Sequence, residues 1–380
     1  MNNIERNTLL LTKCAIRSIK NEKFSFSDEE LNNIYSFSKK HDIAHIVAYG
    51  LKINDAIPRN SIGKKFNDAI FNAYFRYQQT CDTARKIFEI LESDNIDYLP
   101  LKGSVIRSFY PEPWMRTSSD IDILIRETDI NKAIESITSK TDFKSDLPGK
   151  YDVSLFSEKL HQHIELHFSL LDDRYEEMQK PLIDIWSKAI KDNKNSYSLP
   201  EEYFLYYHYA HMAKHFKFMG FGIRLVLDTY IINKNIKYDY TQNNIFKQGN
   251  LITFSKAIDN LAEIWFGDKN SNKEFDDLTD YILGSGIYGT AANKVNNINR
   301  SKLNYLIYRI FMPYDQMIFS YPILKKHRFL LPFFWFLRFF KFFKKDSAKR
   351  SLHEVKANLN SSNNEKEKIK AMLTKYDLPQ

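Results

Sequence analysis

Two aspartates separated by one residue, Asp120 and Asp122, are the strongest chemical signal in the sequence. They open the segment DIDILI, whose alternating polar and apolar residues predict a half-buried strand. Residues two apart on a strand point to the same face, so both carboxylates lie together while the isoleucines enter the core. Adjacent carboxylates repel each other unless a divalent cation lies between them, and Mg²⁺ prefers such ligands. Taken alone, the pair also fits an exposed, solvated strand.

A glycine-containing turn precedes this pair by about sixteen residues. Lys102, Gly103 and Ser104 follow the apolar stretch IDYLPL, which predicts a strand, and they precede a short predicted helix. Glycine lets a phosphate approach the backbone, and the amides that follow direct positive charge at it. Lys102 and Arg116 flank the site in sequence and are suited to neutralising phosphate oxygens. The turn therefore predicts a phosphate-binding element beside the aspartates.

The segments KGS, YPEPWMR and SDIDILI resemble the nucleotidyltransferase superfamily that includes DNA polymerase β. More narrowly, they resemble the uncharacterised nucleotidyltransferase family often found in bacterial surface-polysaccharide gene clusters. The superfamily pattern is Gly-Ser or Gly-Gly, a spacer, Asp-x-Asp/Glu and a third carboxylate on a later strand. The segment HQHIELHF, residues 161–168, matches the third element at Glu165. Its alternation independently places Glu165 on the face opposite Ile164.

The resemblance implies Mg²⁺-dependent transfer of a nucleoside monophosphate from an NTP, such as ATP, to a hydroxyl acceptor, with pyrophosphate released. Asp120 and Asp122 would hold two Mg²⁺ ions, with Mn²⁺ as the alternative, and Glu165 would be the third ligand. Gly103 and Ser104 would grip the triphosphate. The other candidate nucleotide-binding residues come from their positions in the sequence and are Lys102, Arg116, His211 and Lys214. The family's gene-cluster association points to polysaccharide biosynthesis and to a saccharide, lipid-linked intermediate or peptide as acceptor.

Two histidines, His163 and His167, share the predicted face of Glu165. A His-x-Glu-x-His array is able to bind zinc or manganese. The alternatives are that these histidines contact the metal ligands from outside or are simply exposed.

Three more histidines recur at three- and four-residue steps on the helix predicted after Pro200: His208, His211 and His215. With Lys214 they form either a basic wall closing the nucleotide cleft or a polar helix face packed with aromatic residues. The next predicted helix places Arg224 and Asp228 four residues apart, which favours an ordinary ion pair within that helix.

Composition limits the classes of protein that remain. The chain has 380 residues, of which 43% are hydrophobic and 27% charged, and this excludes wholesale disorder. Only 11 glycines and 11 prolines favour a helix-rich protein over a many-stranded barrel. Two cysteines, Cys14 and Cys81, exclude a disulfide framework and favour the cytoplasm. The net charge of +8 favours an anionic partner, or it reflects a composition rich in Lys, Asn and Ile.

The order of the expected helices and strands predicts a helix-rich α+β protein. A short mixed sheet with helices lies between an N-terminal and a C-terminal helical region. We expect five parts along the chain: an N-terminal helical region over 1–95, a polymerase β-type nucleotidyltransferase core over 96–195, a C-terminal helical domain over 196–322, a basic aromatic segment over 323–350 and a polar tail over 351–380. The tail is expected to be mobile apart from a terminal set of helical turns.

The basic aromatic segment holds nine Lys or Arg against one acid, Asp346, and nine aromatics between Phe329 and Phe343. It is too short and too interrupted to span a bilayer. One interpretation is a helix lying in an anionic membrane surface, which would put the protein at the inner face of the membrane. The alternative is a core helix with a basic outer face. No recognised nucleic-acid module appears, so no specific nucleic acid is predicted.

Two other functions are compatible with parts of the pattern. In a glycosyltransferase, Asp-x-Asp would hold Mn²⁺ and a nucleotide-sugar, but neither Gly103-Ser104 nor Glu165 would be needed. In a non-enzymatic membrane-surface adaptor, the fold would be retained without turnover.

Overall fold

The computed structural model describes residues 1–20, 24–146, 149, 151–172, 175–287, 289–290, 311–314, 317–318, 321–341 and 363–378. The chain divides into two compact units. The first comprises Met1–Lys214 and Phe221–Ile287, and the second comprises His215–Gly220 and Tyr288–Gln380. The division into five parts expected from the sequence stays a prediction.

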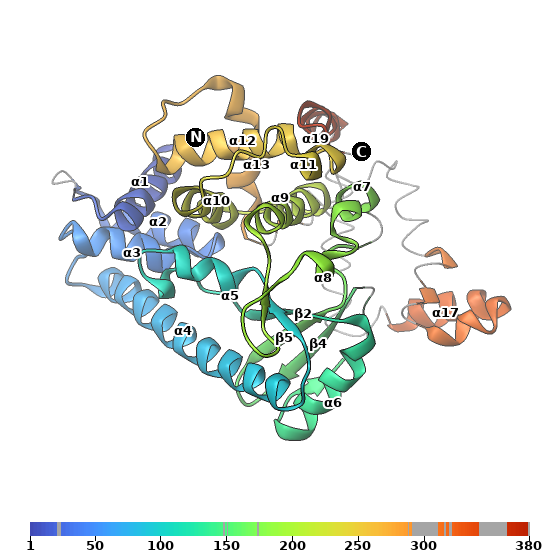
Figure 1. The fold of residues 1–380 in the computed structure, drawn as a ribbon. Helices are drawn as coiled ribbons and strands as arrows, with labels where there is room; N and C mark the ends of the chain where they lie inside the picture. The colour runs from blue at the N-terminus through green and yellow to red at the C-terminus, as the bar shows by residue number, and fades with distance from the viewer. Residues whose placement is uncertain are drawn as a thin grey trace. The chain divides into compact units, whose positions relative to one another are not determined.

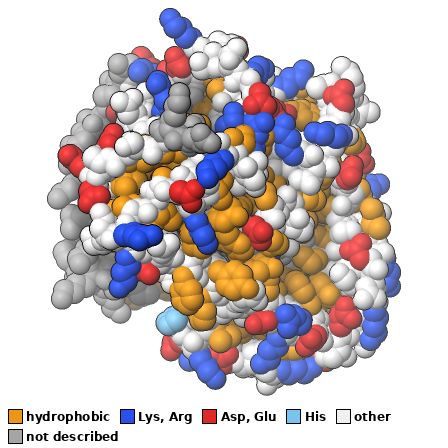
Figure 2. Space-filling model, turned by 90° about the vertical axis from the view of Figure 1, so that its left-hand side faces the viewer, with side chains coloured by type: hydrophobic (Ala, Val, Ile, Leu, Met, Phe, Trp, Pro, Cys, Tyr) orange, Lys and Arg blue, Asp and Glu red, His pale blue; other side chains and the backbone are white. Residues whose placement is uncertain are grey.

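The first unit begins with four helices: α1 (Asn3–Arg17), α2 (Asp28–Lys40), α3 (Ala44–Ile53) and α4 (Ser61–Ser93). Helix α2 starts with a capping box, in which the Ser27 hydroxyl accepts from the Glu30 N–H and the Glu30 carboxylate accepts from the Ser27 N–H. Figure 2 faces these helices and shows hydrophobic side chains gathered on this side of the molecule. Helix α4 carries large exposed aromatic side chains, at Phe71, Tyr74 and Phe75.

A five-stranded mixed sheet follows, in the order β1-β2-β5-β4-β3. Its strands are β1 (Tyr98–Pro100), β2 (Asp120–Ile125), β3 (Lys144–Ser145), β4 (Asp152–Ser157) and β5 (Gln162–His167). Strands β2 and β5 are parallel neighbours, while the other pairs are antiparallel. The helix-rich α+β class and the small mixed sheet predicted from the sequence are confirmed.

One face of the sheet is apolar and holds the core of this region. Helix α4 packs there together with α6 (Ile130–Lys140), which a 3₁₀ turn at Glu127–Asp129 precedes. The buried residues include Ile87, Leu91, Ile121, Ile123, Ile125, Ala133, Ile137, Ile164 and Leu166. Each fully buried aliphatic side chain contributes roughly 1.5–3 kcal/mol. A one-residue slip of β2 would exchange its two faces, so this core fixes which residues point the other way.

Short elements connect the sheet to the helices around it. Between β1 and β2 lie α5 (Gly103–Ile106) and two 3₁₀ turns, Arg107–Phe109 and Pro113–Met115. After β5 the chain forms α7 (Glu176–Gln179), a 3₁₀ turn (Lys180–Leu182), α8 (Ile185–Lys188) and a two-stranded sheet of β6 (Ile190–Lys191) and β7 (Tyr197–Ser198).

Helices complete the first unit: α9 (Glu201–Phe218), whose residues up to Lys214 belong to this unit, α10 (Ile223–Asn235), α11 (Asn244–Gln248), α12 (Ile252–Phe266) and α13 (Asp276–Ser285), which the 3₁₀ turn Lys273–Phe275 precedes. A half-buried carboxylate helps to join them, because Asp259 accepts hydrogen bonds from the hydroxyls of Tyr209 and Tyr240 and from the Asn233 amide.

The second unit contains 3₁₀ turns at Pro322–Lys325 and Arg328–Leu330, α17 (Leu331–Lys341) and α19 (Asn363–Lys375). Helix α19 lies in the expected polar tail, and it buries Ile369, Met372 and Leu373. This helix lies where the sequence predicts a terminal set of helical turns. Across the described ranges, the helices are too short or too polar to cross a membrane.

Candidate active site

Asp122 and Glu165 lie opposite each other in the parallel pairing of β2 with β5. One ligand atom each from Asp122, Glu165 and His167 lie within 4.8 Å of one another, the single such group found among the described residues. All three side chains occupy the face opposite the aliphatic core, because Ile123, Ile164 and Leu166 occupy that core. Residues 43 positions apart in the chain are thus brought together by strand pairing.

Asp120 lies on the same face as Asp122, two residues earlier on β2, and is paired with His163. Its carboxylate accepts a hydrogen bond from the Ser119 hydroxyl. Burial raises the pKa of Asp120, and the nearby charges of Asp122 and Glu165 add to this shift. Asp120 is outside the group whose ligand atoms lie within 4.8 Å. Its predicted role as a metal ligand therefore stays a prediction.

Lys102 places its ammonium group among these carboxylates. Its Nζ donates to Asp122 Oδ1 at 2.6 Å and lies 3.9 Å from Glu165 Oε2. Burial alone would lower the pKa of Lys102, but the charge of Asp122 outweighs burial and the pKa is raised. Burial would likewise raise the pKa of Asp122, whereas Lys102 and His167 hold it well below its usual range. The site is thus arranged around a positive charge.

The backbone at Lys102 is strained. Its φ of 45° and ψ of −118° lie in a region that residues with a side chain rarely adopt. Such a conformation costs roughly 1–3 kcal/mol, and it is typical of functional sites. The strain turns the chain sharply out of β1, directly beside β2, where the Leu101 N–H donates to the Asp122 carbonyl at 2.9 Å.

The sequence left the role of His167 open, and the structure places this residue at the centre of the group. This residue is 1% exposed, and its Nε2 lies 3.0 Å from Asp122 Oδ1 and 3.4 Å from Glu165 Oε2. Burial and Lys102 lower the pKa of His167, but hydrogen bonds to both carboxylates raise it above its ordinary value. His163, by contrast, is exposed.

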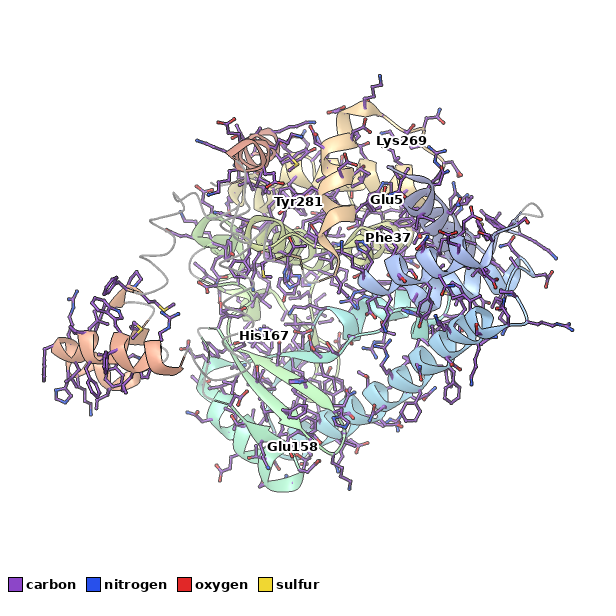
Figure 3. All side chains as sticks on the ribbon, turned by 180° about the vertical axis from the view of Figure 1, so that it is seen from behind. Glu5, Phe37, Glu158, His167, Lys269 and Tyr281 are labelled. Atoms are coloured by element: carbon purple, nitrogen blue, oxygen red, sulfur yellow. The ribbon has the colours of Figure 1, made fainter. Side chains whose placement is uncertain are left out.

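Figure 3 labels His167 at the end of the sheet nearest the helices and Glu158 at the far end. The pairing agrees with this view, since β4 and β5 join through the turn that contains Glu158. His167 Nδ1 is buried and has no hydrogen-bond partner among the described residues. The Tyr151 ring stacks beside the imidazole, with centroids 6.0 Å apart. The face therefore holds an unsatisfied buried polar atom next to the carboxylates.

The turn Lys102-Gly103-Ser104 follows β1 as predicted and opens α5. The Ser104 N–H donates to the Leu101 carbonyl at 3.1 Å. Gly103 packs closely against the loop before β2, because a Cβ there would lie 3.1 Å from Ser118 Cβ, a tighter contact than is usual. Arg107 holds Gly103 and Ser118 close together, because it donates to the Gly103 carbonyl and to the Ser118 hydroxyl. The loop that leads into β2 is thereby held against the turn.

Arg116 is committed to a buried ion pair rather than to an open cleft. Its Nε lies 2.7 Å from Asp228 Oδ1, and Asp228 is fully buried and also accepts from the Tyr110 hydroxyl. The sequence predicts an ion pair between Arg224 and Asp228 within α10, and this prediction is wrong. Arg224 instead pairs with Asp42, with its Nη1 2.6 Å from Asp42 Oδ2. The predicted contact of Arg116 with nucleotide stays a prediction, and this geometry does not support it.

Lys214 reaches the polar face of the sheet from α9. Its Nζ donates to the Tyr151 hydroxyl at 2.9 Å and lies 4.4 Å from the centre of that ring. Burial lowers the pKa of Lys214 to about 8, and the charge of Lys102 contributes in the same direction. A second cation is therefore placed near Lys102 and Glu165, where an anionic ligand would be stabilised.

His211 and Tyr207 line a small cavity of about 40 Å³ with Lys102, room for about one or two waters. The Tyr207 hydroxyl is buried and has no hydrogen-bond partner within the described part of the chain. His208 also lines this cavity and lies 2.9 Å from Thr229 Oγ1. Burial lowers the pKa of His208 to about 4, so this residue is neutral at pH 7 and adds no charge to a basic wall.

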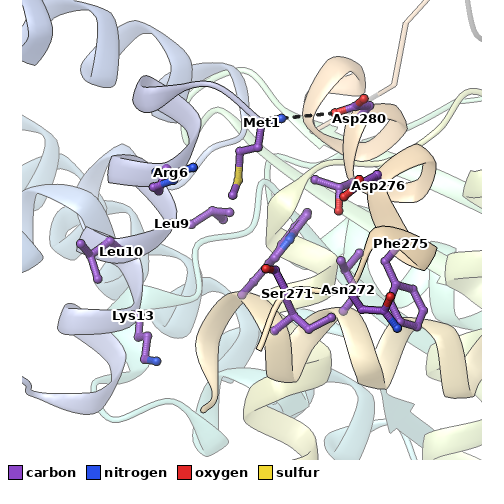
Figure 4. Close-up of a pocket in the computed structure, with 14 residues that line it drawn as sticks. Met1, Arg6, Leu9, Leu10, Lys13, Ser271, Asn272, Phe275, Asp276 and Asp280 are labelled. Carbon is purple, nitrogen blue, oxygen red and sulfur yellow. Dashed lines mark ion pairs between the residues drawn. The ribbon is translucent and has the colours of Figure 1, made fainter. Parts of the chain in front are cut away.

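A separate pocket of about 370 Å³ lies between α1 and the α12–α13 region (Figure 4). Its rim includes the N-terminal ammonium of Met1, 3.8 Å from Asp280 Oδ1. Neither Asp122 nor Glu165 lines it. The pocket is therefore independent of the carboxylate group on the sheet.

The family model described as "Uncharacterised nucleotidyltransferase" matches residues 27–265, which is more than half of the chain. The helix-rich fold with its small mixed sheet agrees with this match, which gives the class as a nucleotidyltransferase. The chain belongs to the uncharacterised nucleotidyltransferase family. No curated protein and no solved structure matched it.

Proposed function

We propose that the chain transfers a nucleoside monophosphate from an NTP to a hydroxyl acceptor in a Mg²⁺-dependent reaction that releases pyrophosphate. The convergence of Asp122, Glu165 and His167 within 4.8 Å supports this most strongly, because it joins two separate segments of the sequence pattern. The strained turn at Lys102, held beside β2 by the Leu101–Asp122 hydrogen bond, supports it independently.

The donor set fits a divalent cation. Two carboxylates and an imidazole are hard to intermediate ligands, and Mg²⁺ and Mn²⁺ both accept them. Asp122 and Glu165 would hold the ion, with Asp120 completing a second position and His167 as a nitrogen ligand or an orienting group. When bound, the metal would stabilise the attacking and leaving oxygens of an in-line displacement.

The remaining groups would position the triphosphate. Gly103 would present its backbone amide and Ser104 its hydroxyl at the start of α5, where phosphate oxygens are favoured. Lys102 would leave Asp122 and contact a phosphate oxygen instead, so the lysine ammonium group would still have a negatively charged partner. Lys214 would approach the phosphates from the opposite side. Glu165 would take the acceptor proton, and its greater exposure than that of Asp122 supports this role.

The acceptor we propose is a hydroxyl on a saccharide, a lipid-linked intermediate or a peptide. Such a group would enter over the exposed side of Glu165, whose side chain is 31% accessible. The NTP donor and the two free cysteines, Cys14 and Cys81, fit a cytoplasmic enzyme.

Incubation with each α-labelled NTP and Mg²⁺, with and without cell lysate, tests the proposal. Label should pass to a lysate component or to the protein itself, and self-labelling would indicate a peptide acceptor. A glycosyltransferase would instead release a nucleoside diphosphate from a nucleotide-sugar. A non-enzymatic adaptor would transfer no label with any NTP. Either result would exclude the proposed reaction.

A further inference from the structure

Helix α17 of the second unit has aromatic side chains on two sides. On its inner side, Phe334 lies against Tyr321, with ring centroids 4.5 Å apart. Trp335 Nε1 donates to the Met312 carbonyl at 2.7 Å. These contacts hold the helix in the unit and fix which side chains point outward.

Its outer side carries three phenylalanines that water can reach. Phe333 is 55% exposed and Phe336 is 61% exposed, and Phe329 in the preceding 3₁₀ turn is 77% exposed. Their spacing of four and three residues places them along one side. Ile323, 49% exposed, adds an aliphatic side chain. Large apolar groups gathered in this way mark an interaction surface more often than a solvated one.

Basic groups adjoin these phenylalanines in the chain. Lys325, Lys326 and Arg328 are all exposed and directly precede Phe329. Residues 321–338 contain no Asp or Glu. The α17 surface is defined here by Ile323, Lys325, Lys326, Arg328, Phe329, Phe333 and Phe336.

We propose that the α17 surface docks on an anionic lipid bilayer. The cations would lie at the headgroups while the phenylalanines enter the boundary with the acyl chains. Helix α17 is about 16 Å long at 1.5 Å per residue, too short to cross the hydrocarbon core, so it lies in the interface. Ile323 favours lipid over single-stranded nucleic acid, because an aliphatic side chain offers no ring for a base to stack on.

Co-sedimentation of the full chain with vesicles measures this interaction. Vesicles of phosphatidylcholine with phosphatidylglycerol should bind the protein, and added salt should weaken the binding. Vesicles of phosphatidylcholine alone should bind at least about tenfold more weakly. Equal binding to both vesicles, or no binding to either, would overturn the proposal. So would a polynucleotide that binds more tightly than the anionic vesicles and displaces the protein from them.

Two variants separate the apolar and the basic contributions. Replacing Phe329, Phe333 and Phe336 by Ser should reduce vesicle binding at least about tenfold, and K325E/K326E should do the same. The charge reversal changes only exposed side chains, so it tests the surface even if the triple variant unfolds. Unchanged binding in K325E/K326E would contradict the proposal.

Helix α4 supplies a matched control, since Phe71 and Phe75 are 69% and 60% exposed on the first unit. Phe71→Ser with Phe75→Ser removes exposed phenylalanines from elsewhere and should leave vesicle binding unchanged. An equal loss in this control would show nonspecific apolar adhesion and overturn the assignment to α17. Vesicle binding is measured without nucleotide, so its outcome is independent of the proposed transferase reaction.

Discussion

Lys102 Nζ lies 2.6 Å from Asp122 Oδ1 and 3.9 Å from Glu165 Oε2, so its ammonium group contacts both carboxylates that we propose as metal ligands. The strained backbone at Lys102 directs its side chain there. The pair offsets charges that would otherwise repel each other in a buried setting. Lys102 therefore links two predicted functions, the metal site and the phosphate turn, which the sequence presents as separate segments.

Lys102→Met should tighten Mn²⁺ binding about tenfold in the protein without nucleotide, because a competing positive charge is removed. Electron paramagnetic resonance of free Mn²⁺ during a titration measures the affinity. Lys140→Met is the matched control, since Lys140 pairs with Asp94 on the surface, remote from the cluster. Unchanged or weaker Mn²⁺ binding in Lys102→Met would show that the lysine does not compete with metal.

His167→Gln should weaken Mn²⁺ binding about 10- to 100-fold, as expected for a nitrogen ligand or for a group that orients ligands. His163→Gln provides the comparison, because His163 lies on the same face of the same strand but is exposed. Its Mn²⁺ affinity should stay at the wild-type value. Equal effects of the two substitutions would contradict a specific role for His167.

Asp228→Asn should destabilise the protein by about 3–5 kcal/mol, because it leaves the buried Arg116 charge uncompensated. Urea unfolding monitored by circular dichroism measures the free energy of unfolding. Nucleotide affinity of the folded protein should be unchanged, since Arg116 and Asp228 are buried away from solvent. A variant Arg116→Lys that stayed stable but bound NTP more weakly would restore the contact predicted from the sequence.

NTP affinity should decline as the pH rises through about 8, because Lys214 loses its proton there and a neutral amine attracts phosphate less. Calorimetric titration at pH 7 and pH 9.5 should show about a tenfold weaker affinity at the higher pH, if the charge contributes about 1.4 kcal/mol. Lys214→Met should bind weakly at both values. A wild-type affinity that is equal at both would exclude Lys214 from nucleotide binding.

The lowered pKa of Lys214 also predicts how the stability of the folded protein changes with pH. Burial lowers the pKa of Lys214 from its ordinary value of 10.5 to about 8 in the folded protein. Between these two pH values the unfolded chain binds more protons at Lys214 than the folded protein does. The contribution of Lys214 to the free energy of unfolding therefore increases as the pH rises. Lys214→Met should remove that gain in pH-dependent unfolding experiments. If the free energy of unfolding changed equally with pH in the wild type and in Lys214→Met, the low pKa of Lys214 would be contradicted.

The local patterns of the sequence are sufficient to identify strands β2 and β5 and the face on which each carboxylate lies. Alternation identifies β2 and β5, and it places Asp122 and Glu165 on polar faces. It does not show that these strands are neighbours, because pairing depends on contacts far apart in the chain. For the same reason the sequence misassigned Asp228, whose partner Arg116 comes from a distant loop.

The sequence is least informative about the burial and the contacts of individual polar side chains. The His-x-Glu-x-His spacing indicates that His163 and His167 share a face, but only the fold buries one and exposes the other. Tyr207 gives no local signal, since it is one of several tyrosines on an aromatic helix. The sequence predicts Lys102 as a phosphate ligand, but it gives no signal for the contact with Asp122 or for the unusual backbone conformation at this lysine.

Release of pyrophosphate from NTP in the presence of Mg²⁺ is the most direct measurement of the proposed chemistry. The wild-type protein and Asp97→Asn, which alters a carboxylate paired with Arg126 away from the cluster, should release it at similar rates. Asp122→Asn and Glu165→Gln should lower the rate at least about 100-fold while the proteins stay folded. Wild-type rates of pyrophosphate release in folded Asp122→Asn, or nucleoside diphosphate as the product, would contradict the metal-dependent nucleotidyl transfer.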